Sequence, residues 1–404
     1  MKQLLRMVLV VFLIKLGLAM MPSFQVDMGA WLAWAERLSS VGFAHFYSDD
    51  IWTQYTPGFL YWLWLVGKIG WIQPLAIKIP VIIADMLTGY LIYLVVRKVS
   101  HKWASFAYFF YVLNPVVLFD GSIWGQVDGI LTLAMFASTY CLVEKKNPYW
   151  SWLLTAVSLL IKPQAIAIVP ILGLATLVKY GWRMLVVSVL MSGLVILLLY
   201  WPFFPQNPIM GLLSLTQKMG VSYPYTSLYA FNLWSYVGMW TPDSTRLWGA
   251  TYFAWGAGIM AAVFAMLFIK NRKGLVEAKN MYLLFALSCL IFFLFPTRVH
   301  ERYLFPMFAY LIAYVGIKKQ KALVVVASII TVVYSLNLYL PYSYYEPVTN
   351  PLKNIAVEQW ITSAIPWLAS AQLGIFIVLL FWEDIEQWSK HYFQLGTRRK
   401  TISQ

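Results

Sequence analysis

The chain has 404 residues, of which 61% are hydrophobic, 18% aromatic and only 11% charged, and its mean hydropathy is +0.69. A soluble domain carries about a quarter charged residues, so this composition excludes an ordinary soluble protein. The net charge of +14 lies in short basic clusters between apolar runs, which indicates membrane topology and argues against nucleic-acid binding.

Apolar runs of about 15 to 22 residues recur along the whole chain. They predict an all-α fold, a polytopic transmembrane helical bundle of about twelve spans, because lipid requires backbone groups to be paired internally. The first run follows Lys2 and Arg6 as in a signal peptide, but without a small-residue cleavage site, so we expect a retained span. The predicted spans cover residues 4–21, 79–96, 103–119, 129–143, 149–161, 164–178, 184–200, 248–269, 281–296, 303–317, 322–340 and 366–382.

Residues 22–78 are expected to form a long outer loop with two helices at the membrane interface. Residues 28–43 place their apolar side chains on one face and their polar side chains on the other. Residues 58–73 are dense in Trp and Tyr and contain Lys68, which favours an interfacial helix. An additional span there is the alternative, but it would move the basic cluster at 97–102 to the outer side.

The basic residues set the predicted orientation. With a cytoplasmic N-terminus, most of the 30 Lys and Arg residues lie on the cytoplasmic side, and the C-terminus is cytoplasmic too. We predict a catalytic transmembrane region over 1–317, including the outer loops 22–78 and 201–247. Residues 318–404 supply the C-terminal spans and a basic tail. The loops 201–247 and 341–365 are expected to form a lid or substrate platform.

Four polar clusters interrupt the apolar segments, and this topology places all of them at the outer membrane boundary. Charge in such a place is costly and commonly functional. The first is Asp27, at the start of the first interfacial helix. Its carboxylate is a candidate N-cap for that helix. The alternative is a general base held at the membrane edge.

The second cluster is the outer turn 120–128, DGSIWGQVD. A tight turn needs the small residues that it contains. It does not need two carboxylates, a Gln and a Trp in nine residues, which favours a functional role. A helix cap is the alternative for Asp128.

The third cluster, Lys162-Pro163-Gln164, separates the short apolar runs 149–161 and 164–178. Thirteen helical residues rise about 20 Å, less than the roughly 30 Å hydrocarbon core. Lys162 is therefore expected in a recessed cavity, where a cation suits a lipid phosphate. A lysine that extends to the membrane surface is the alternative.

The fourth cluster, 298–302, contains Arg298, His300, Glu301 and Arg302, and it breaks the positive-inside pattern. Arginine forks match phosphate oxygens, whereas an Arg–Glu surface pair is the alternative. Together the clusters predict a carboxylate-rich, phosphate-binding outer cleft that opens to lipid. The chain has no Gly-rich nucleotide-binding loop, so the phosphate is expected on a lipid.

These residues resemble the GT-C superfamily of integral membrane glycosyltransferases. The resemblance covers about residues 1–310 and rests on the early Asp27, on WGQVD (124–128) and on VHERY (299–303). It is closest to bacterial relatives of the dolichyl-phosphate-glucose-dependent glucosyltransferases. One departure is that the tyrosine-proline-proline of many relatives reads Tyr55-Thr56-Pro57 here.

The resemblance implies a role for each cluster. Asp27 would be the catalytic base of an inverting displacement. The donor phosphate would be bound by Arg298, His300 and Arg302, with Lys162 added on physical grounds. The sugar and acceptor pocket would be formed by Asp128, Gln126, Asp120, Glu301 and Tyr55.

No cofactor and no metal are expected. The Asp49-Asp50 pair could bind a divalent cation, but similar glucosyltransferases work without metal. Cys141 and Cys289 both lie in apolar runs, so neither a disulfide framework nor a thiolate metal site is predicted.

The predicted function is transfer of a hexose or pentose from a polyprenyl-phosphate sugar to a glycan, glycolipid or protein acceptor, as in a mannosyltransferase-like hexosyltransferase. The expected location is the outer face of a bacterial plasma (inner) membrane, with the bilayer as partner and no nucleic acid. A transporter or flippase of a lipid-linked or anionic substrate is the alternative, and a non-catalytic scaffold is a further one. Lys15 and Asp85 lie inside spans without an assigned role, although Asp85 is a candidate to face the cleft.

Overall fold

The computed structural model describes residues 2–48, 51, 53, 55–271, 275 and 277–388, with side chains from residue 6 onward. The predicted basic tail beyond residue 388 and the Asp49-Asp50 pair lie outside this part. The first half consists of α1 (Lys2–Ala19), α2 (Gln25–Val41), α3 (Pro57–Lys68), α4 (Pro74–Val96), α5 (His101–Val112), α6 (Pro115–Val117), the π-helix η1 (Leu118–Trp124), α7 (Asp128–Val143), α8 (Pro148–Ile161), the 3-10 helix η2 (Pro163–Ile168) and α9 (Val169–Tyr200).

The second half is also mainly helical and contains four short strands in the described part. Its elements are α10 (Pro208–Val221), β1 (Ser227–Leu228), the 3-10 helix η3 (Leu233–Tyr236), β2 (Arg246–Leu247), β3 (Ala250–Thr251), α11 (Tyr252–Lys270), α12 (Ala278–Leu294), β4 (Val299–His300), α13 (Met307–Lys318), α14 (Lys321–Tyr345) and α15 (Ile355–Leu380).

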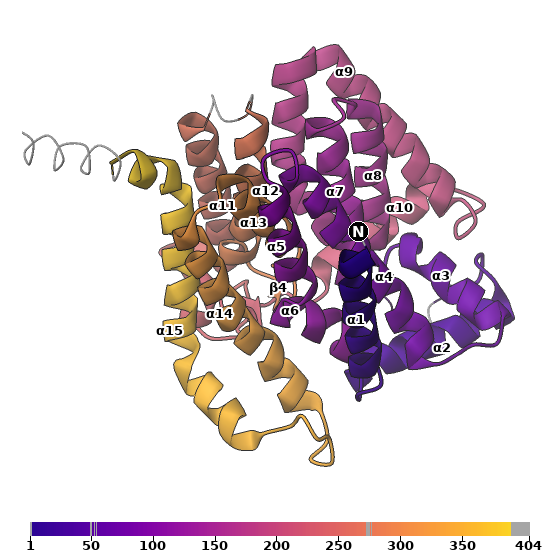
Figure 1. Cartoon of the computed structure of the whole chain (residues 1–404). Coiled ribbons are helices and arrows are strands. Elements are labelled where there is room, and N and C mark those ends of the chain that lie inside the picture. Colours follow the sequence, from indigo (N-terminus) through magenta and orange to yellow (C-terminus); the bar gives the residue numbers. More distant parts are fainter. Residues whose placement is uncertain are drawn as a thin grey trace, which may run out of the picture.

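The helices form a multi-pass membrane protein, as the apolar runs predict. In the described part, α4, η2 with α9, α11, α14 and α15 are long and apolar enough to cross a membrane, which makes five spans. The bent pair of α5 and α6–η1 makes a sixth. Shorter apolar helices, α7, α8, α12 and α13, lie among them (Figure 1). Each predicted span corresponds to helix, although several are shorter than the hydrocarbon core requires.

One predicted span differs from the structure, and the predicted break between two others is present. The span predicted over 103–119 is broken, because Pro115 has no N–H to continue α5 and Asn114 caps the next segment by accepting from the Val116 N–H. The two parts are bent by 43°. The spans predicted over 164–178 and 184–200 are separate helical segments, as expected, because α9 is broken between them at Gly181 by a non-helical φ of 83°.

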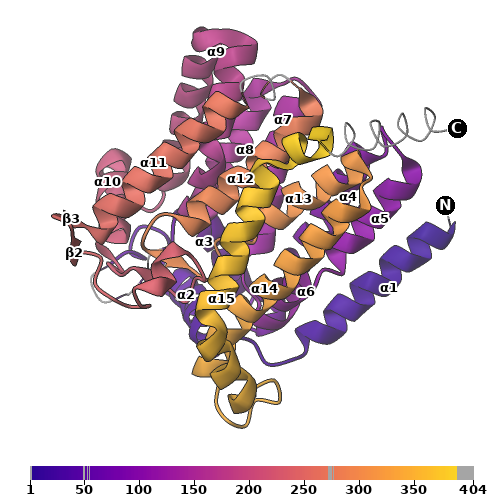
Figure 2. The same ribbon diagram turned by 90° about the vertical axis from the view of Figure 1, so that its left-hand side faces the viewer.

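The main hydrophobic core lies between α4, α5, α7, α12 and α13 and continues into α14 and α15. The division at 317/318 stays a prediction, since residues on both sides of it share this core. A second core joins α2 and α3 to α4 through Trp31, Leu38, Leu60 and Leu63. The amphipathic face predicted for α2 is therefore the face that packs. In Figure 2, α1 runs along one edge of the bundle.

One end of the bundle, which we call the site end, carries α2, α3, the segment 201–251 and the loop 346–354 (lower part of Figure 1). Two small ladders order the segment 201–251. β1 pairs in parallel with β4, so Leu228 lies beside His300, and β2 pairs antiparallel with β3. The long aromatic loop therefore supports the turn that contains the fourth polar cluster.

Candidate active site

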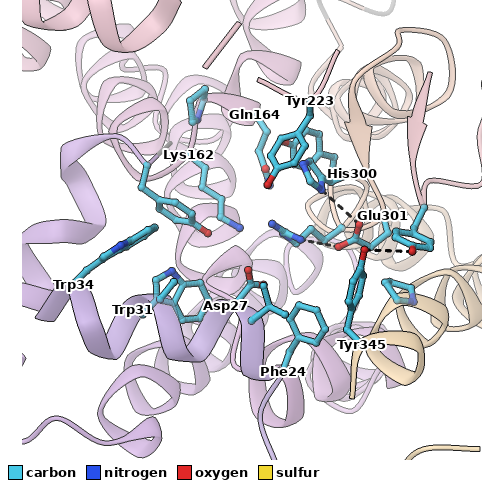
Figure 3. Close-up of a pocket in the computed structure, with 18 of the residues that line it drawn as sticks. Phe24, Asp27, Trp31, Trp34, Lys162, Gln164, Tyr223, His300, Glu301 and Tyr345 are labelled. Carbon is cyan, nitrogen blue, oxygen red and sulfur yellow. Dashed lines mark hydrogen bonds and ion pairs between the residues drawn. The ribbon is translucent and has the colours of Figure 1, made fainter. Parts of the chain in front are cut away.

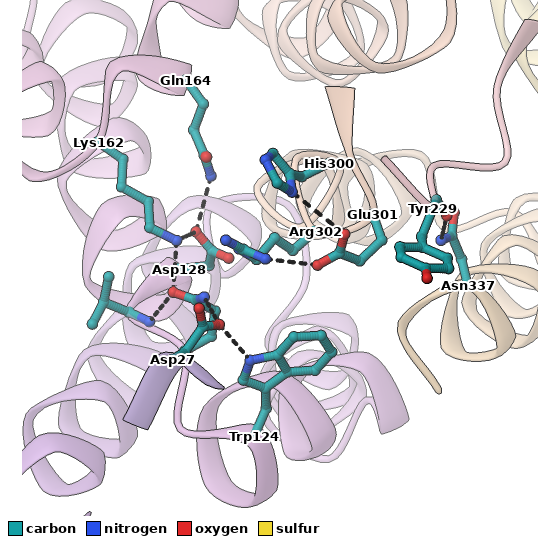
Figure 4. Close-up of polar contacts among 12 residues, drawn as sticks. Asp27, Trp124, Asp128, Lys162, Gln164, Tyr229, His300, Glu301, Arg302 and Asn337 are labelled. Carbon is teal, nitrogen blue, oxygen red and sulfur yellow. Dashed lines mark hydrogen bonds and ion pairs between the residues drawn. The ribbon is translucent and has the colours of Figure 1, made fainter. Parts of the chain in front are cut away.

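Asp27 lies in the first turn of α2, and its side chain points into the molecule (Figure 4). Its Oδ2 atom accepts a hydrogen bond from Trp124 Nε1 at 2.9 Å and one from Gln126 Nε2 at 2.7 Å. The helix is preceded by Phe24 at the N-cap position, and no side-chain cap is formed there. Asp27 therefore binds the 120–128 turn, and the alternative role as N-cap is not the one seen.

The 120–128 turn brings Trp124 and Gln126 to Asp27 because of its backbone shape. The N–H groups of Gly125 and Gln126 both donate to the Asp120 carbonyl, at 3.0 and 2.9 Å. Gly125 has a φ of 86°, and a Cβ atom there would lie 2.7 Å from the Met28 side chain. The positive φ favours glycine at this position, and a larger residue would also displace the end of the Met28 side chain.

Lys162 ends α8 and is 5% exposed, so it is the recessed lysine that the short helices predict. Its Nζ atom donates to Gln126 Oε1 and to Asp128 Oδ1, both at 2.7 Å. Gln164 Nε2 donates to the same Asp128 oxygen at 2.9 Å. Because the buried ammonium is paired and hydrogen-bonded, it stays in the bundle instead of extending to the membrane surface.

The 298–302 turn places three polar side chains beside one another. Arg302 Nη1 donates to Glu301 Oε1 at 2.7 Å, and His300 Nδ1 lies 3.7 Å from Glu301 Oε2. The Glu301 N–H donates to the Leu228 carbonyl at 3.1 Å, which fixes the turn to β1. The carboxylate thus lies between the guanidinium and the imidazole (Figure 4).

The charge states in this turn follow from burial and from neighbouring charges. Burial alone would raise the pKa of Glu301, but Arg302 and His300 lower it to about 2. Burial lowers the pKa of His300 below its ordinary value, and the Glu301 carboxylate opposes this shift. Glu301 is therefore an anion and His300 a neutral donor at pH 7.

Arg298 lies in the same turn but points away from the other residues. Its Nε atom donates to Asp243 Oδ2 at 2.6 Å and its Nη2 atom to Asp243 Oδ1 at 3.2 Å. Its guanidinium also lies 4.6 Å from the centre of the Phe253 ring. The φ of Arg298 is 64°, a conformation that this pairing holds in place. The structure does not bring this predicted phosphate ligand to the other site residues.

A cavity of about 270 Å³ lies between Asp27, Lys162 and the turn that contains His300 (Figure 3). Asp27, Lys162 and Arg302 reach it from different elements, α2, the end of α8 and the 298–302 turn. The lining consists of Phe24, Val26, Asp27, Ala30, Trp31, Trp34, Tyr55, Lys162, Pro163, Gln164, Tyr223, Tyr229, Trp240, His300, Glu301, Arg302, Tyr303, Pro341 and Tyr345.

The residues predicted for the sugar and acceptor pocket fall into two groups. Tyr55 and Glu301 line the cavity. Gln126 and Asp128 lie behind it and bind the lining residues. Asp120 is deeper still, fully buried, and neither of its carboxylate oxygens has a hydrogen-bond partner in the described part.

Most of the aromatic side chains that line the cavity could not be identified from the sequence pattern. Trp31 and Trp34 come from the packed face of α2, where they are indistinguishable from core residues in the sequence pattern. Tyr223 and Tyr229 come from the segment after α10, and Tyr345 is the last residue of α14. The clusters of Tyr around them (YPY and YSYY) are the only sequence signal for these side chains.

No metal site is formed in the described part of the chain, where no group of three or more His, Cys, Asp and Glu side chains is arranged to hold an ion.

The comparisons show what the fold resembles. No protein family and no curated protein matches the sequence. The structure is similar to the crystal structure of ArnT from Cupriavidus metallidurans bound to undecaprenyl phosphate, with a TM-score of 0.59 and 15% identity. It is also similar to that protein in the apo state, with a TM-score of 0.56 and 14% identity. Both comparisons cover 94% of this chain and 76% of ArnT.

The chain has the ArnT fold. The all-α, polytopic membrane fold that the sequence predicts is therefore confirmed. The fold similarity covers 94% of the chain, which is more than the first 310 or so residues that carry the sequence resemblance. At 14 to 15% identity this similarity shows the fold alone.

Proposed function

We propose that the chain is a membrane glycosyltransferase that takes a sugar from a polyprenyl phosphate and transfers it to an acceptor hydroxyl. The observation that carries this proposal is the cavity itself, where a carboxylate held by Trp124 and Gln126 faces two cations, the buried Lys162 and the half-buried Arg302. The ArnT fold, seen with undecaprenyl phosphate bound in ArnT, supports the same lipid class as a donor.

Asp27 is the base in this proposal. Its Oδ2 atom is occupied by Trp124 and Gln126, whereas Oδ1 accepts no hydrogen bond from the described residues. Oδ1 is therefore the atom that takes the acceptor proton. A base must lie within hydrogen-bond reach of the proton it removes, and a carboxylate at the cavity wall meets that requirement.

Lys162, Arg302 and His300 bind the donor phosphate. The Lys162 ammonium has three N–H groups, two of which are used by Gln126 and Asp128. The Arg302 guanidinium lines the cavity, and among the described residues its hydrogen bond to Glu301 uses only the Nη1 atom. Both cations thus keep a donor free for an anionic group. In this proposal Arg298 supports the turn through Asp243 instead of contacting phosphate.

The reaction is a single displacement at the anomeric carbon. The acceptor oxygen forms the new bond to that carbon, and its proton passes to Asp27. The bond from the anomeric carbon to the phosphate oxygen breaks, and its electron pair leaves with the polyprenyl phosphate. Cations fixed where this charge develops contribute strongly to catalysis, because they need no reorganisation during the reaction.

The sugar is a hexose or a pentose, and the acceptor is a glycan, glycolipid or protein. Trp31, Trp34 and Tyr55 offer flat apolar surfaces beside Asp27, suited to the faces of a sugar ring. We further propose that the site end faces away from the cytoplasm of a bacterial cell. The basic turns that follow α4 and α13 lie at the opposite end of these helices, in agreement with the positive-inside pattern.

The test is transfer of label by the purified full chain. Polyprenyl-phosphate mannose, glucose and arabinose, each radiolabelled, are incubated in turn with a membrane lipid extract. We expect transfer from at least one donor, and a decrease of about 100-fold or more in the Asp27→Asn variant, since a general base contributes about that much. Asn keeps an oxygen for Trp124 and Gln126, so the variant should fold.

Two further variants separate the roles. Lys162→Met should abolish binding of the donor, whereas Lys218→Met, a lysine on α10 outside the cavity, should leave transfer unchanged. No transfer or hydrolysis with any donor, in a folded protein that still binds the lipid phosphate, would favour a transporter of lipid-linked substrates over the enzyme.

A further inference from the structure

The loop 346–354 joins α14 to α15 and touches the start of α2. Glu346 Oε1 accepts a hydrogen bond from the backbone N–H of Gln25 at 2.8 Å, across 321 positions of sequence. Gln25 is the first residue of α2, two residues before Asp27. The contact therefore joins a part of the chain with no recognised motif to the helix turn that carries the base.

The start of α2 needs an acceptor that its own N-cap cannot supply. The first N–H groups of a helix have no partner within the helix, and a polar side chain at the N-cap usually accepts from one of them. Phe24 occupies that position and has no side-chain oxygen. A carboxylate at a helix N-terminus also interacts favourably with the helix dipole. Glu346 thus takes the place of the missing cap.

Glu346 is itself held in one orientation. It is 3% exposed, and its Oε2 atom accepts a hydrogen bond from Asn350 Nδ2 at 2.9 Å. Asn350 Nδ2 also donates to the Tyr342 hydroxyl at 3.1 Å, and that hydroxyl donates to the Pro22 carbonyl at 2.8 Å. The loop and the end of α14 therefore bind the segment 22–25 at both of its ends.

Aromatic packing joins the same segments. The Phe24 ring lies 4.5 Å from the Trp124 ring, and the Trp124 ring lies 6.0 Å from that of Tyr342, as measured between centroids. The three side chains form a small buried cluster of their own. Because the Trp124 N–H donates to Asp27, this cluster connects the end of α14 to the carboxylate.

We propose that Glu346 is a positioning residue for Asp27, which holds the first turn of α2 where Trp124 and Gln126 can orient the carboxylate. The proposal rests on the role of Asp27 as base in the proposed function. Glu346 does not line the cavity, so it acts through Asp27 and not through contact with substrate. A shift of about 1 Å in a catalytic group can lower a rate about 100-fold.

Hydrogen exchange measures how often the first turn of α2 opens, and the experiment needs no substrate. The full chain in lipid nanodiscs is compared with Glu346→Ala and with the control Glu358→Ala. Glu358 accepts from Ser343 in the same region but does not contact α2. We expect Glu346→Ala to speed exchange in the peptide 22–31 by about tenfold, because a capped turn opens less often. Unchanged exchange would overturn the proposal.

Transfer kinetics then test whether the contact of Glu346 with α2 positions Asp27 for catalysis. The donor is whichever of the three labelled polyprenyl-phosphate sugars supports transfer. Glu346→Ala should lower kcat about tenfold with the donor KM within about twofold of wild type. Glu346→Gln keeps an acceptor for the Gln25 N–H and should recover most of kcat. Glu358→Ala should match the wild type.

A double-variant cycle separates positioning from general damage. In an Asp27→Asn background, Glu346→Ala should change the residual transfer rate by less than about twofold, since the group that it positions no longer acts. A further tenfold decrease would show that Glu346 acts by another route. If Asp27→Asn itself retains full transfer, the proposed base is wrong, while the exchange data still decide whether Glu346 holds α2.

Discussion

The carboxylate of Asp27 is oriented by two side chains that do not react. Trp124 and Gln126 both donate to Oδ2, which fixes the rotation of the carboxylate and leaves Oδ1 toward the cavity. The carbonyl oxygen of the same Gln126 amide accepts from Lys162. One amide therefore links the proposed base to a proposed phosphate ligand, so a change at either end affects the position of the other.

Replacing Trp124 with Phe tests this arrangement. The change removes the N–H donor to Asp27 but keeps a ring to pack against Phe24 and Tyr342. We expect kcat to decrease about tenfold with little change in donor KM, since only the orientation of the base is affected. Steady-state transfer of label measures both constants.

The matched control is Trp62→Phe. Trp62 donates its ring N–H to the Ala76 carbonyl at 3.1 Å and does not line the cavity. Its loss should affect stability but not kcat. Equal decreases in kcat for the two variants would mean that a lost buried hydrogen bond, and not the orientation of Asp27, explains the effect.

The lowered pKa of His300 predicts how stability depends on pH. Burial keeps this imidazole neutral in the folded chain below its ordinary pKa of about 6.5. Between the folded and unfolded pKa values the unfolded chain binds more protons, so the free energy of unfolding decreases as the pH is lowered through this range. Above pH 7 the contribution is constant.

Thermal unfolding in detergent from about pH 8 to about pH 5.5 measures this dependence. The decrease in unfolding temperature toward low pH should be smaller in His300→Gln than in the wild type. His101→Gln, at an exposed histidine, serves as the control. Parallel curves for the wild type and His300→Gln would contradict the assignment.

At the level of elements, close contact between α3 and α8 places Lys162. A Cβ atom on Gly58, in the first turn of α3, would lie 2.4 Å from the Leu160 carbonyl oxygen. Thr56 Oγ1 donates to that same oxygen at 2.7 Å. α3 therefore packs against the last turn of α8, two residues before the buried lysine.

Gly58→Ala should separate these helices. The added methyl would meet backbone atoms of α8, which cannot turn aside as a flexible side chain can, so the two helices must move apart. Overpacking of this kind costs about 1 to 3 kcal/mol. Lys162 would move with α8, and transfer should decrease as well. Gly29→Ala on α2 is the control, because nothing lies within 4 Å of its added Cβ. Equal unfolding temperatures for the two variants would exclude the expected clash.

The elements could be predicted from sequence more fully than their contacts. Apolar runs located the helices, and helix length alone predicted that Lys162 is recessed, because thirteen residues cannot reach across the hydrocarbon core. The polar clusters also converge as expected, apart from Arg298. Its partner Asp243 is 55 positions away in the sequence, and no local pattern connects the two residues.

Other parts of the site had no sequence signal for a physical reason. Trp31 and Trp34 lie on the face of α2 that also packs, so periodicity cannot separate core from lining. The capping of α2 by Glu346 depends on two segments at opposite ends of the chain. Such contacts are set by how helices pack, which periodicity does not describe.

For the whole molecule, the attachment of α1 has consequences at the site. α1 lies at the edge of the bundle (Figure 2), and it leads directly into the segment before Asp27. Lys15 Nζ donates to Asp85 Oδ2 of α4 at 2.8 Å, and both side chains are fully buried. Lys78 donates to the carbonyls of Ala19 and Met21 at 3.0 Å. Asp85 thus binds α1, although sequence analysis considered it for the cleft.

Removing one charge of the buried Lys15–Asp85 pair should destabilise the folded chain more than removing both charges together. Lys15→Met leaves a buried carboxylate without its partner, which costs about 3 to 5 kcal/mol, and Asp85→Asn leaves the ammonium alone at a similar cost. The double variant Lys15→Met with Asp85→Asn removes both charges together. Its stability should therefore exceed that of either single variant, since neither buried charge is left unpaired.

Unfolding in detergent measures these differences, with the exposed Lys98–Glu144 pair as the control. Lys98→Met should change stability by less than about 1 kcal/mol, because water screens exposed charges. A double variant at 15 and 85 that loses the sum of the two single losses would show that the charges act independently. Since α1 precedes Asp27, the single variants should also lose transfer activity, and the double variant should regain it together with its stability.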